Sequence, residues 1–211
     1  MSATDSTSFA QRVRNRIQYQ LLGDRGLDRR KVICLGLSRT GTSSLSVALA
    51  NLGIPTVHFP PIYKVETDGS LSLDWKWWFG MYDGFTDISV VHFFRELDSL
   101  FPQTKYILTK RELSSWLRSC SVHFAEPSKD PDIFGIRKNF YGSATYDESR
   151  FTETYENHHR TVIDYFADRQ DDLLEVDICK GETMARLCDF LKLPHPADLA
   201  YPHLNAQKKK A

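Results

Sequence analysis

Several features that would assign a protein quickly to a class are missing from this sequence of 211 residues. It has no apolar run long enough to cross a bilayer, and its polar N-terminus lacks the apolar segment of a signal peptide. Its four cysteines, Cys34, Cys120, Cys179 and Cys188, contain no C-x-x-C pair. We therefore expect a cytoplasmic protein with reduced thiols, without stable membrane insertion and without a bound metal.

An excess of charge of one sign is also missing. The 27 Lys and Arg residues balance 27 Asp and Glu residues, so the chain has no overall basic field of the kind that attracts nucleic acid. We expect no nucleic-acid partner, and a homo-oligomer remains compatible with the sequence. Aromatic residues, in contrast, make up 12% of the chain, which suits a core together with an aromatic pocket for a small molecule.

The stretch from residue 31 to residue 52 has the clearest pattern. Lys31 to Leu37 is a run rich in Val, Ile and Leu, which is typical of a buried parallel strand. Gly36 to Gly41 is a tight loop bounded by glycines, and Thr42 to Leu52 has leucines at helical spacing. A strand, a glycine loop and a helix in this order direct backbone N–H groups and the positive helix end at one point. This arrangement predicts a binding site for the phosphate of a nucleotide.

The loop lacks the lysine of a nucleotide-hydrolysing P-loop. In the pattern G-x-x-x-x-G-K-[ST] that lysine contacts the β- and γ-phosphates. Gly36 and Gly41 keep the glycine spacing, but Thr42 stands where the lysine belongs. The only cation in the loop is Arg39, before the second glycine. A triphosphate would therefore lose a major charge partner, which indicates a different phosphate ester.

Residues 38–45, Ser-Arg-Thr-Gly-Thr-Ser-Ser-Leu, resemble a loop of the sulfotransferases that use 3′-phosphoadenosine 5′-phosphosulfate (PAPS). In that family the 5′-phosphosulfate loop is usually written P-K-S-G-T-T-x-L, and Arg39 replaces its lysine. The resemblance implies that Arg39 stabilises charge on the bridging oxygen as the S–O bond breaks. It also implies that the 5′-phosphosulfate is bound by Ser38, Arg39, Thr40, Gly41, Thr42, Ser43 and Ser44.

A second stretch, Thr104 to Phe124, carries the same resemblance. Tyr106 to Thr109 is a predicted buried strand, Arg111 follows it, and Glu112 opens a predicted helix. In the 3′-phosphate motif of sulfotransferases an Arg at a strand end precedes a helix Ser by eight residues, and Arg111 and Ser119 match these positions. A planar guanidinium binds phosphate bidentately. The alternative is an Arg paired with a nearby carboxylate and a Ser that faces solvent.

Two residues at the ends of other predicted strands are candidates for the general base. His58 lies near the end of the strand predicted over Ile54 to Phe59, and Asp87 ends a short strand that starts at Gly84. The carboxyl edge of an open α/β sheet is where such folds bind ligands. The resemblance implies that His58, or failing it Asp87, accepts the proton of the acceptor. A structural histidine remains the alternative for the first residue. An N-cap for a helix from about Val90 to Leu100 remains the alternative for the second.

The other segments lead to further expectations. We expect an N-terminal tail with an amphipathic helix over residues 1–30 and a single domain over residues 31–211. The tryptophan-rich stretch from Leu71 to Tyr82 is interpreted as a buried helix, some of whose rings line a pocket for the acceptor. Ala125 to Arg150 is expected to be irregular and to cover the site. Phe151 to Asp168 is predicted to be a helix.

The C-terminal part supports both the main interpretation and a rival. The predicted strand Leu173 to Val176 is closed by Asp177, as in an NTPase whose Asp binds Mg²⁺. Residues 173–205, however, are similar to the end of a microbial branch of sulfotransferases. The same branch carries a D-x-P motif at Asp87, where this chain has Ser89 in place of Pro.

The sequence therefore predicts an α/β fold with a mainly parallel sheet and helices on both faces, the three-layer arrangement of P-loop NTPases. The resemblance implies a sulfotransferase that moves a sulfuryl group from PAPS to a hydroxyl or amine of a small-molecule acceptor. It would release 3′-phosphoadenosine 5′-phosphate (PAP) and need no metal. The alternatives are a Mg²⁺-dependent nucleotide phosphotransferase with a degenerate P-loop and a non-catalytic nucleotide-binding protein.

Overall fold

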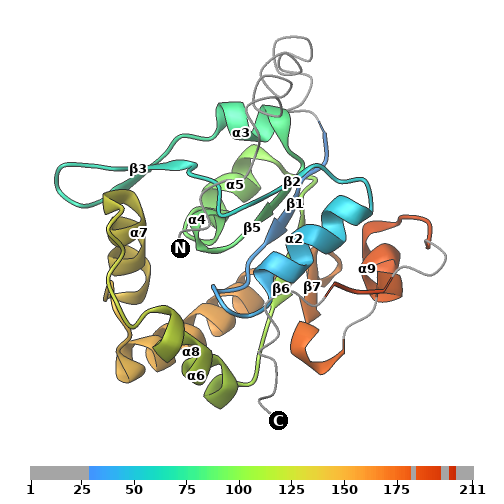
Figure 1. The fold of residues 1–211 in the computed structure, drawn as a ribbon. Coiled ribbons are helices and arrows are strands. Elements are labelled where there is room, and N and C mark those ends of the chain that lie inside the picture. Colours follow the sequence, from blue (N-terminus) through green and yellow to red (C-terminus); the bar gives the residue numbers. More distant parts are fainter. Residues whose placement is uncertain (1–28, 182–183, 196–199, 203–211) are drawn as a thin grey trace.

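A computed structural model describes residues 29–181, 184–195 and 200–202 of the protein (Figure 1). The helix predicted near the N-terminus lies outside the described residues. Within them, a parallel sheet forms the centre of the molecule, and its strand order is β2-β5-β1-β6-β7. The strands are β1 (Val32–Cys34), β2 (Thr56–His58), β5 (Gly84–Thr86), β6 (Lys105–Thr109) and β7 (Leu173–Val176). Because β1 lies between β5 and β6, the loop that follows β1 is at the middle of the carboxyl edge.

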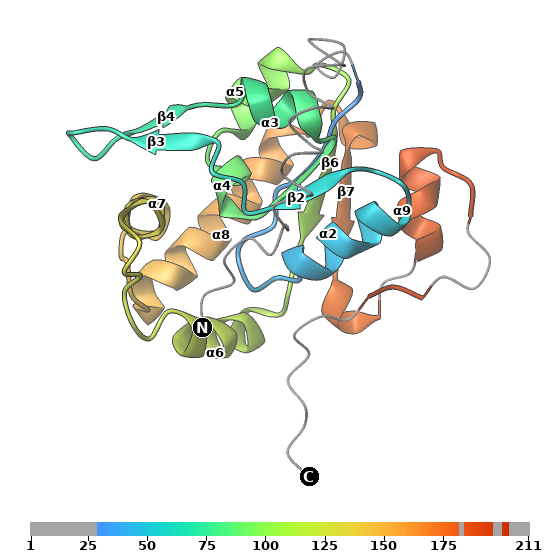
Figure 2. The ribbon, with the colours of Figure 1, turned by 45° about the horizontal axis from the view of Figure 1, so that its top comes forward.

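Helices cover both faces of this sheet. Along β1, Val32 and Cys34 join a hydrophobic cluster with α2 (Thr42–Asn51) and α9 (Met184–Leu191), whereas Ile33 joins a second cluster on the opposite face. Such alternation is what a strand buried on both faces requires. Figure 2 shows α2 and α9 on one side and α8 (Glu148–Tyr165) on the other. The predicted α/β fold is confirmed.

The second cluster is rich in aromatic rings. Phe79 stacks between Phe85 of β5 and Phe101, with ring centroids 3.9 and 4.7 Å away. Trp75 and Trp78 pack against this cluster, and Trp77 is exposed. The remaining helices are α3 (Lys76–Met81), α4 (Ile88–Val91), α5 (Phe94–Leu100), α6 (Leu113–His123) and α7 (Pro131–Tyr141), with short 3-10 turns at Gln170–Asp172 and Ile178–Lys180.

Two predicted helices have different bounds in the structure. The first residues of the tryptophan-rich stretch form β4 (Leu71–Leu73), which pairs with β3 (Tyr63–Val65) in an antiparallel hairpin, so only α3 is helical. The predicted helix over residues 90–100 is instead α4 and α5, separated at His92 and Phe93. Both errors arise because short elements carry too few residues to display a period.

The expectation of an irregular segment over residues 125–150 is wrong, because α7 lies within it. The Asp130 side chain accepts hydrogen bonds from the N–H groups of Asp132 and Ile133, and Pro131 occupies the first turn, where its missing N–H costs nothing. Gly142 ends the helix with a φ of 69°. Both end signals are present in the sequence.

Candidate active site

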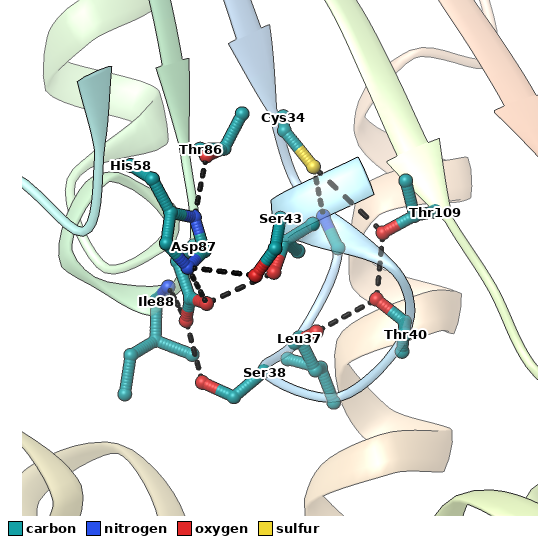
Figure 3. Close-up of polar contacts among 12 residues, drawn as sticks. Cys34, Leu37, Ser38, Thr40, Ser43, His58, Thr86, Asp87, Ile88 and Thr109 are labelled. Atoms are coloured by element: carbon teal, nitrogen blue, oxygen red, sulfur yellow. Dashed lines mark hydrogen bonds and ion pairs between the residues drawn. The ribbon is translucent and has the colours of Figure 1, made fainter. Parts of the chain in front are cut away.

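The loop between β1 and α2 is held in shape by its own side chains (Figure 3). Thr40 donates its N–H to the Leu37 carbonyl oxygen at 3.1 Å, and its Oγ1 lies 2.6 Å from both that oxygen and Thr109 Oγ1. A Cβ on Gly36 would lie 1.6 Å from Thr109 Oγ1, so only glycine fits where the loop passes β6. The loop is therefore fixed against the neighbouring strand.

The loop ends at the N-terminus of α2. Gly41 has a φ of 103°, which is accessible to glycine, and its carbonyl accepts the N–H of Leu45 at 3.0 Å. The N–H groups of the first helical turn have no acceptor inside the helix. Together with the positive end of the helix dipole they favour an anion at this point.

Asp87 lies directly beside this loop with a nearly buried side chain. Its Oδ1 accepts hydrogen bonds from Ser38 Oγ at 2.5 Å and from the Ile88 N–H at 2.7 Å, and its Oδ2 accepts one from Thr42 Oγ1 at 2.9 Å. Asp87 is thus the N-cap of α4, as the sequence alternative proposed, and it also orients two hydroxyls of the loop. Figure 3 shows its carboxylate between the loop and α4.

His58 lies at the same edge and is open to solvent. Its Nδ1 is 2.8 Å from Thr86 Oγ1, and its Nε2 is 3.1 Å from Ser43 Oγ and 3.5 Å from Asp87 Oδ2. Its side chain is 36% exposed, whereas that of Asp87 is only 8% exposed. Of the two candidates for the general base, His58 is the one that an acceptor can reach.

The two arginines singled out in the sequence lie together, with a different pairing from the expected one. Arg39 Nε donates to Ser119 Oγ at 3.0 Å, and Arg111 Nη1 donates to the Arg39 carbonyl oxygen at 3.2 Å. Arg111 Nε donates to Ser115 Oγ at 3.0 Å. Within the described part of the chain neither guanidinium forms an ion pair. Ser115 was missed, although its place one helical turn before Ser119 could have indicated it.

Aromatic side chains anchor these groups. Trp116 Nε1 donates to the Ser38 carbonyl oxygen at 2.9 Å. The Tyr155 hydroxyl donates to the Arg111 carbonyl oxygen and lies 3.3 Å from the Arg111 N–H, which donates to it. The two rings are in contact, with centroids 4.8 Å apart. Sequence reasoning missed both residues, because an aromatic side chain on a helix looks like an ordinary core residue.

Two titratable groups beneath the loop are neutral at pH 7. Burial raises the pKa of the Cys34 thiol to about 11, although its sulfur accepts the Gly36 N–H at 3.4 Å. Burial lowers the pKa of His158 to about 4. Its Nε2 lies 2.6 Å from the Leu35 carbonyl oxygen, which can only accept, so this nitrogen carries the hydrogen. Neither group therefore adds a charge beneath the loop.

The acidic residue that supported the rival prediction follows β7, which β6 separates from β1. The residue after Asp177, Ile178, nevertheless packs on the loop, because a Cβ on Gly41 would lie 3.1 Å from its Cδ1. Among the residues that the structure describes, no group of three or more His, Cys, Asp or Glu side chains is arranged to hold a metal ion. No helix in the described ranges is long and apolar enough to cross a membrane.

A family model described as a sulfotransferase domain matches residues 31–210. The chain belongs to the sulfotransferase family. This sulfotransferase is also 37% identical over 106 residues to a protein of Aspergillus versicolor called "Ava biosynthesis cluster protein M". The similar region covers 42% of this chain and 41% of that protein, so the two match over less than half of their lengths. The resemblance seen in the sequence is confirmed for the family.

Proposed function

We propose that this sulfotransferase moves a sulfuryl group from PAPS to a hydroxyl or amine of a small acceptor. The observation that carries the proposal is the meeting of Arg39, Arg111 and the N-terminus of α2 at the carboxyl edge of the sheet. Two guanidinium groups without ion pairs in the described part of the chain suit a ligand that bears two separate phosphates. Bound PAPS supplies the activated sulfuryl group.

The contacts divide the loop residues into two groups. Thr40 shapes the loop, because its N–H and its hydroxyl both bind inside it. Ser38 and Thr42 direct their hydroxyls to Asp87, so their part in binding falls to the backbone. The 5′-phosphosulfate then lies against Gly41, Ser43, Ser44 and the first N–H groups of α2.

The two arginines take the outer charges of the donor. Arg39 stabilises the charge that grows on the bridging oxygen when the S–O bond breaks. Arg111 binds the 3′-phosphate, with Ser115 and Ser119 as hydroxyl donors close by. The carbonyl contact between the two arginines sets the distance between the two halves of this donor site.

His58 accepts the proton of the acceptor in this proposal. With hydrogen on Nδ1, the ring donates to Thr86 Oγ1, and Nε2, which lies beside Ser43 Oγ, is the nitrogen that can accept a proton. The acceptor oxygen or nitrogen forms its bond to sulfur while the bridging S–O bond breaks. Its proton goes to Nε2, and the electron pair of the broken bond stays on PAP. Asp87 Oδ2, 3.5 Å from Nε2, stabilises the imidazolium that results.

Calorimetric titration tests this function against both alternatives. We expect PAP to bind without Mg²⁺ and more tightly than ATP with Mg²⁺. The opposite order would favour the phosphotransferase. PAP binding with no transfer from PAPS to any member of a panel of phenols, alcohols and amines would favour the non-catalytic protein.

A further inference from the structure

An arginine on α7 is half-buried and packs against an aromatic ring. The guanidinium carbon of Arg137 lies 4.7 Å from the centre of the Phe124 ring. It forms no hydrogen bond or ion pair with any residue that the structure describes. Burial lowers the pKa of Arg137, which reflects the cost of removing its charge from water. A guanidinium in this position gains from an anion that binds beside it.

The same arginine lies within electrostatic range of the candidate active site. The charge of Asp87 acts on Arg137 and opposes the effect of burial on its pKa. Partial loss of water around the ring and the positive charges of Arg39 and Arg137 lower the pKa of His123 to about 4. One imidazole thus responds to an arginine of the loop and to an arginine of α7. Both guanidiniums therefore lie within electrostatic range of His123.

A second polar group of α7 points into that region. Tyr141 lies one helical turn beyond Arg137, and its side chain is 1% exposed. Its hydroxyl is next to Ser38 but forms no well-aligned hydrogen bond with a described residue. A buried hydroxyl without a partner is unfavourable. α7 therefore brings one unpaired cation and one unsatisfied hydroxyl to the border of the site.

The hairpin of β3 and β4 holds α7 in this position. A Cβ on Gly135 would lie 2.9 Å from Val65, so the helix approaches β3 closely. The Tyr63 hydroxyl donates to the Asp132 carbonyl oxygen at 3.4 Å, and Asn139 Nδ2 donates to the Gly69 carbonyl oxygen at 3.2 Å. Figures 1 and 2 both show α7 beside the hairpin. Three contacts along the helix fix its position against the hairpin.

We propose that Arg137 binds a carboxylate of the acceptor, so that the preferred acceptor is itself an acid. This inference rests on the proposed function and adds a substrate class to it. The Phe124 ring covers one face of the guanidinium, and its N–H edge is suited to a planar anion. The donor phosphates are assigned to residues of the loop, of the connection between β6 and α6, and of α6, which leaves Arg137 for the acceptor.

Calorimetry on the PAP-loaded protein tests the assignment with 4-hydroxyphenyl acids that carry no, one or two methylene groups, each against its own amide. We expect the wild type to bind at least one acid about ten times more tightly than its amide. Arg137→Gln should remove that preference and leave the affinity for PAP unchanged, and Arg137→Lys should restore part of it. Lys138→Gln, at the adjacent exposed position, should keep the full preference and is the matched control.

Two results would overturn this inference and leave the proposed function standing. One is a PAP-loaded wild type that binds every acid no better than its amide, or binds none of them. The other is an Arg137→Gln protein that loses as much affinity for PAP as for the acid, because Arg137 would then belong to the donor site. A wild type that does not bind PAP at all would instead overturn the proposed function first.

Discussion

The two ends of the candidate active site differ in how their polar side chains are used. At the loop, Ser38, Thr40 and Thr42 have their hydroxyls bound, two of them to Asp87. At α7, Arg137 and the Tyr141 hydroxyl have no hydrogen-bond partner among the described residues. A loop whose hydroxyls already form hydrogen bonds is held in one shape, which suits one sulfuryl donor. An end whose polar groups lack hydrogen-bond partners obtains those partners from the molecule that binds there.

The largest effect is expected at His58, beside the loop. His58→Gln should reduce turnover by roughly 10² to 10⁴, because the acceptor loses its general base. The affinity for PAP should fall by much less than the rate, because His58 contacts the donor site only at the edge, through Ser43 Oγ and Asp87 Oδ2. Transfer of labelled sulfuryl from PAPS to a 4-hydroxyphenyl acid gives the rate, and calorimetry gives the affinity. An unchanged rate would exclude His58 as the base and turn attention to Asp87.

Removing a hydrogen-bond acceptor at the loop end of the site should lower the stability of the folded protein. Asp87→Asn replaces an oxygen that accepts hydrogen bonds with an amide NH₂, which then faces donors from the loop or from α4. We expect the free energy of unfolding in urea to fall by about 2 kcal/mol. Glu153→Gln, at an exposed position of α8, is the control and should change it by less than about 0.5 kcal/mol. Equal stability of both variants would contradict the role of Asp87 in holding the loop.

Removing the Arg111 guanidinium should weaken binding at only one of the two phosphate sites of the donor. Arg111→Ala should weaken PAP binding by about ten-fold or more, while the affinity for adenosine 5′-phosphosulfate, which lacks the 3′-phosphate, barely moves. Calorimetry measures both, and Arg118→Ala on the exposed side of α6 is the matched control. Similar losses for the two ligands would show that Arg111 acts through the loop and not on the 3′-phosphate.

The smallest effect concerns pH and the support beneath the loop. His158 has a pKa of about 4 in the folded protein and about 6.5 when unfolded. The unfolded state therefore binds more protons between these values, so stability falls as the pH drops through this window. His158→Gln keeps a donor for the Leu35 carbonyl oxygen but does not titrate. Between pH 7.5 and 5.8 it should lose about 1 kcal/mol less than the wild type in urea unfolding. Parallel profiles would refute this.

Local patterns predicted the centre of the molecule well. The apolar run, the two glycines and the leucines after them each restrict the backbone within a few residues, so β1, its loop and α2 follow from the sequence. The arrival of Arg111 and Ser119 near the loop follows from the parallel order of β1 and β6. The partners of these side chains depend on distances between elements. The sequence therefore did not predict that Ser119 pairs with Arg39.

The α7 end was the least predictable part. Only Ile136 and Tyr141 of this helix are buried, five residues apart, so the helix displays no strong apolar stripe. The cap at Asp130 and the proline after it were the available signals. Arg137 is a candidate because it packs on Phe124 and responds to the charge of Asp87. Both of these residues belong to other elements. No pattern along the chain contains that information.

The hydrogen bond from Arg111 Nη1 to the Arg39 carbonyl oxygen joins segments 72 residues apart in the chain. An arginine that moves toward one end of a nucleotide must pull on the backbone that surrounds the other end. Fragments that carry a single phosphate should accordingly bind with positive cooperativity when supplied as a pair, and the intact molecule benefits from both halves at once.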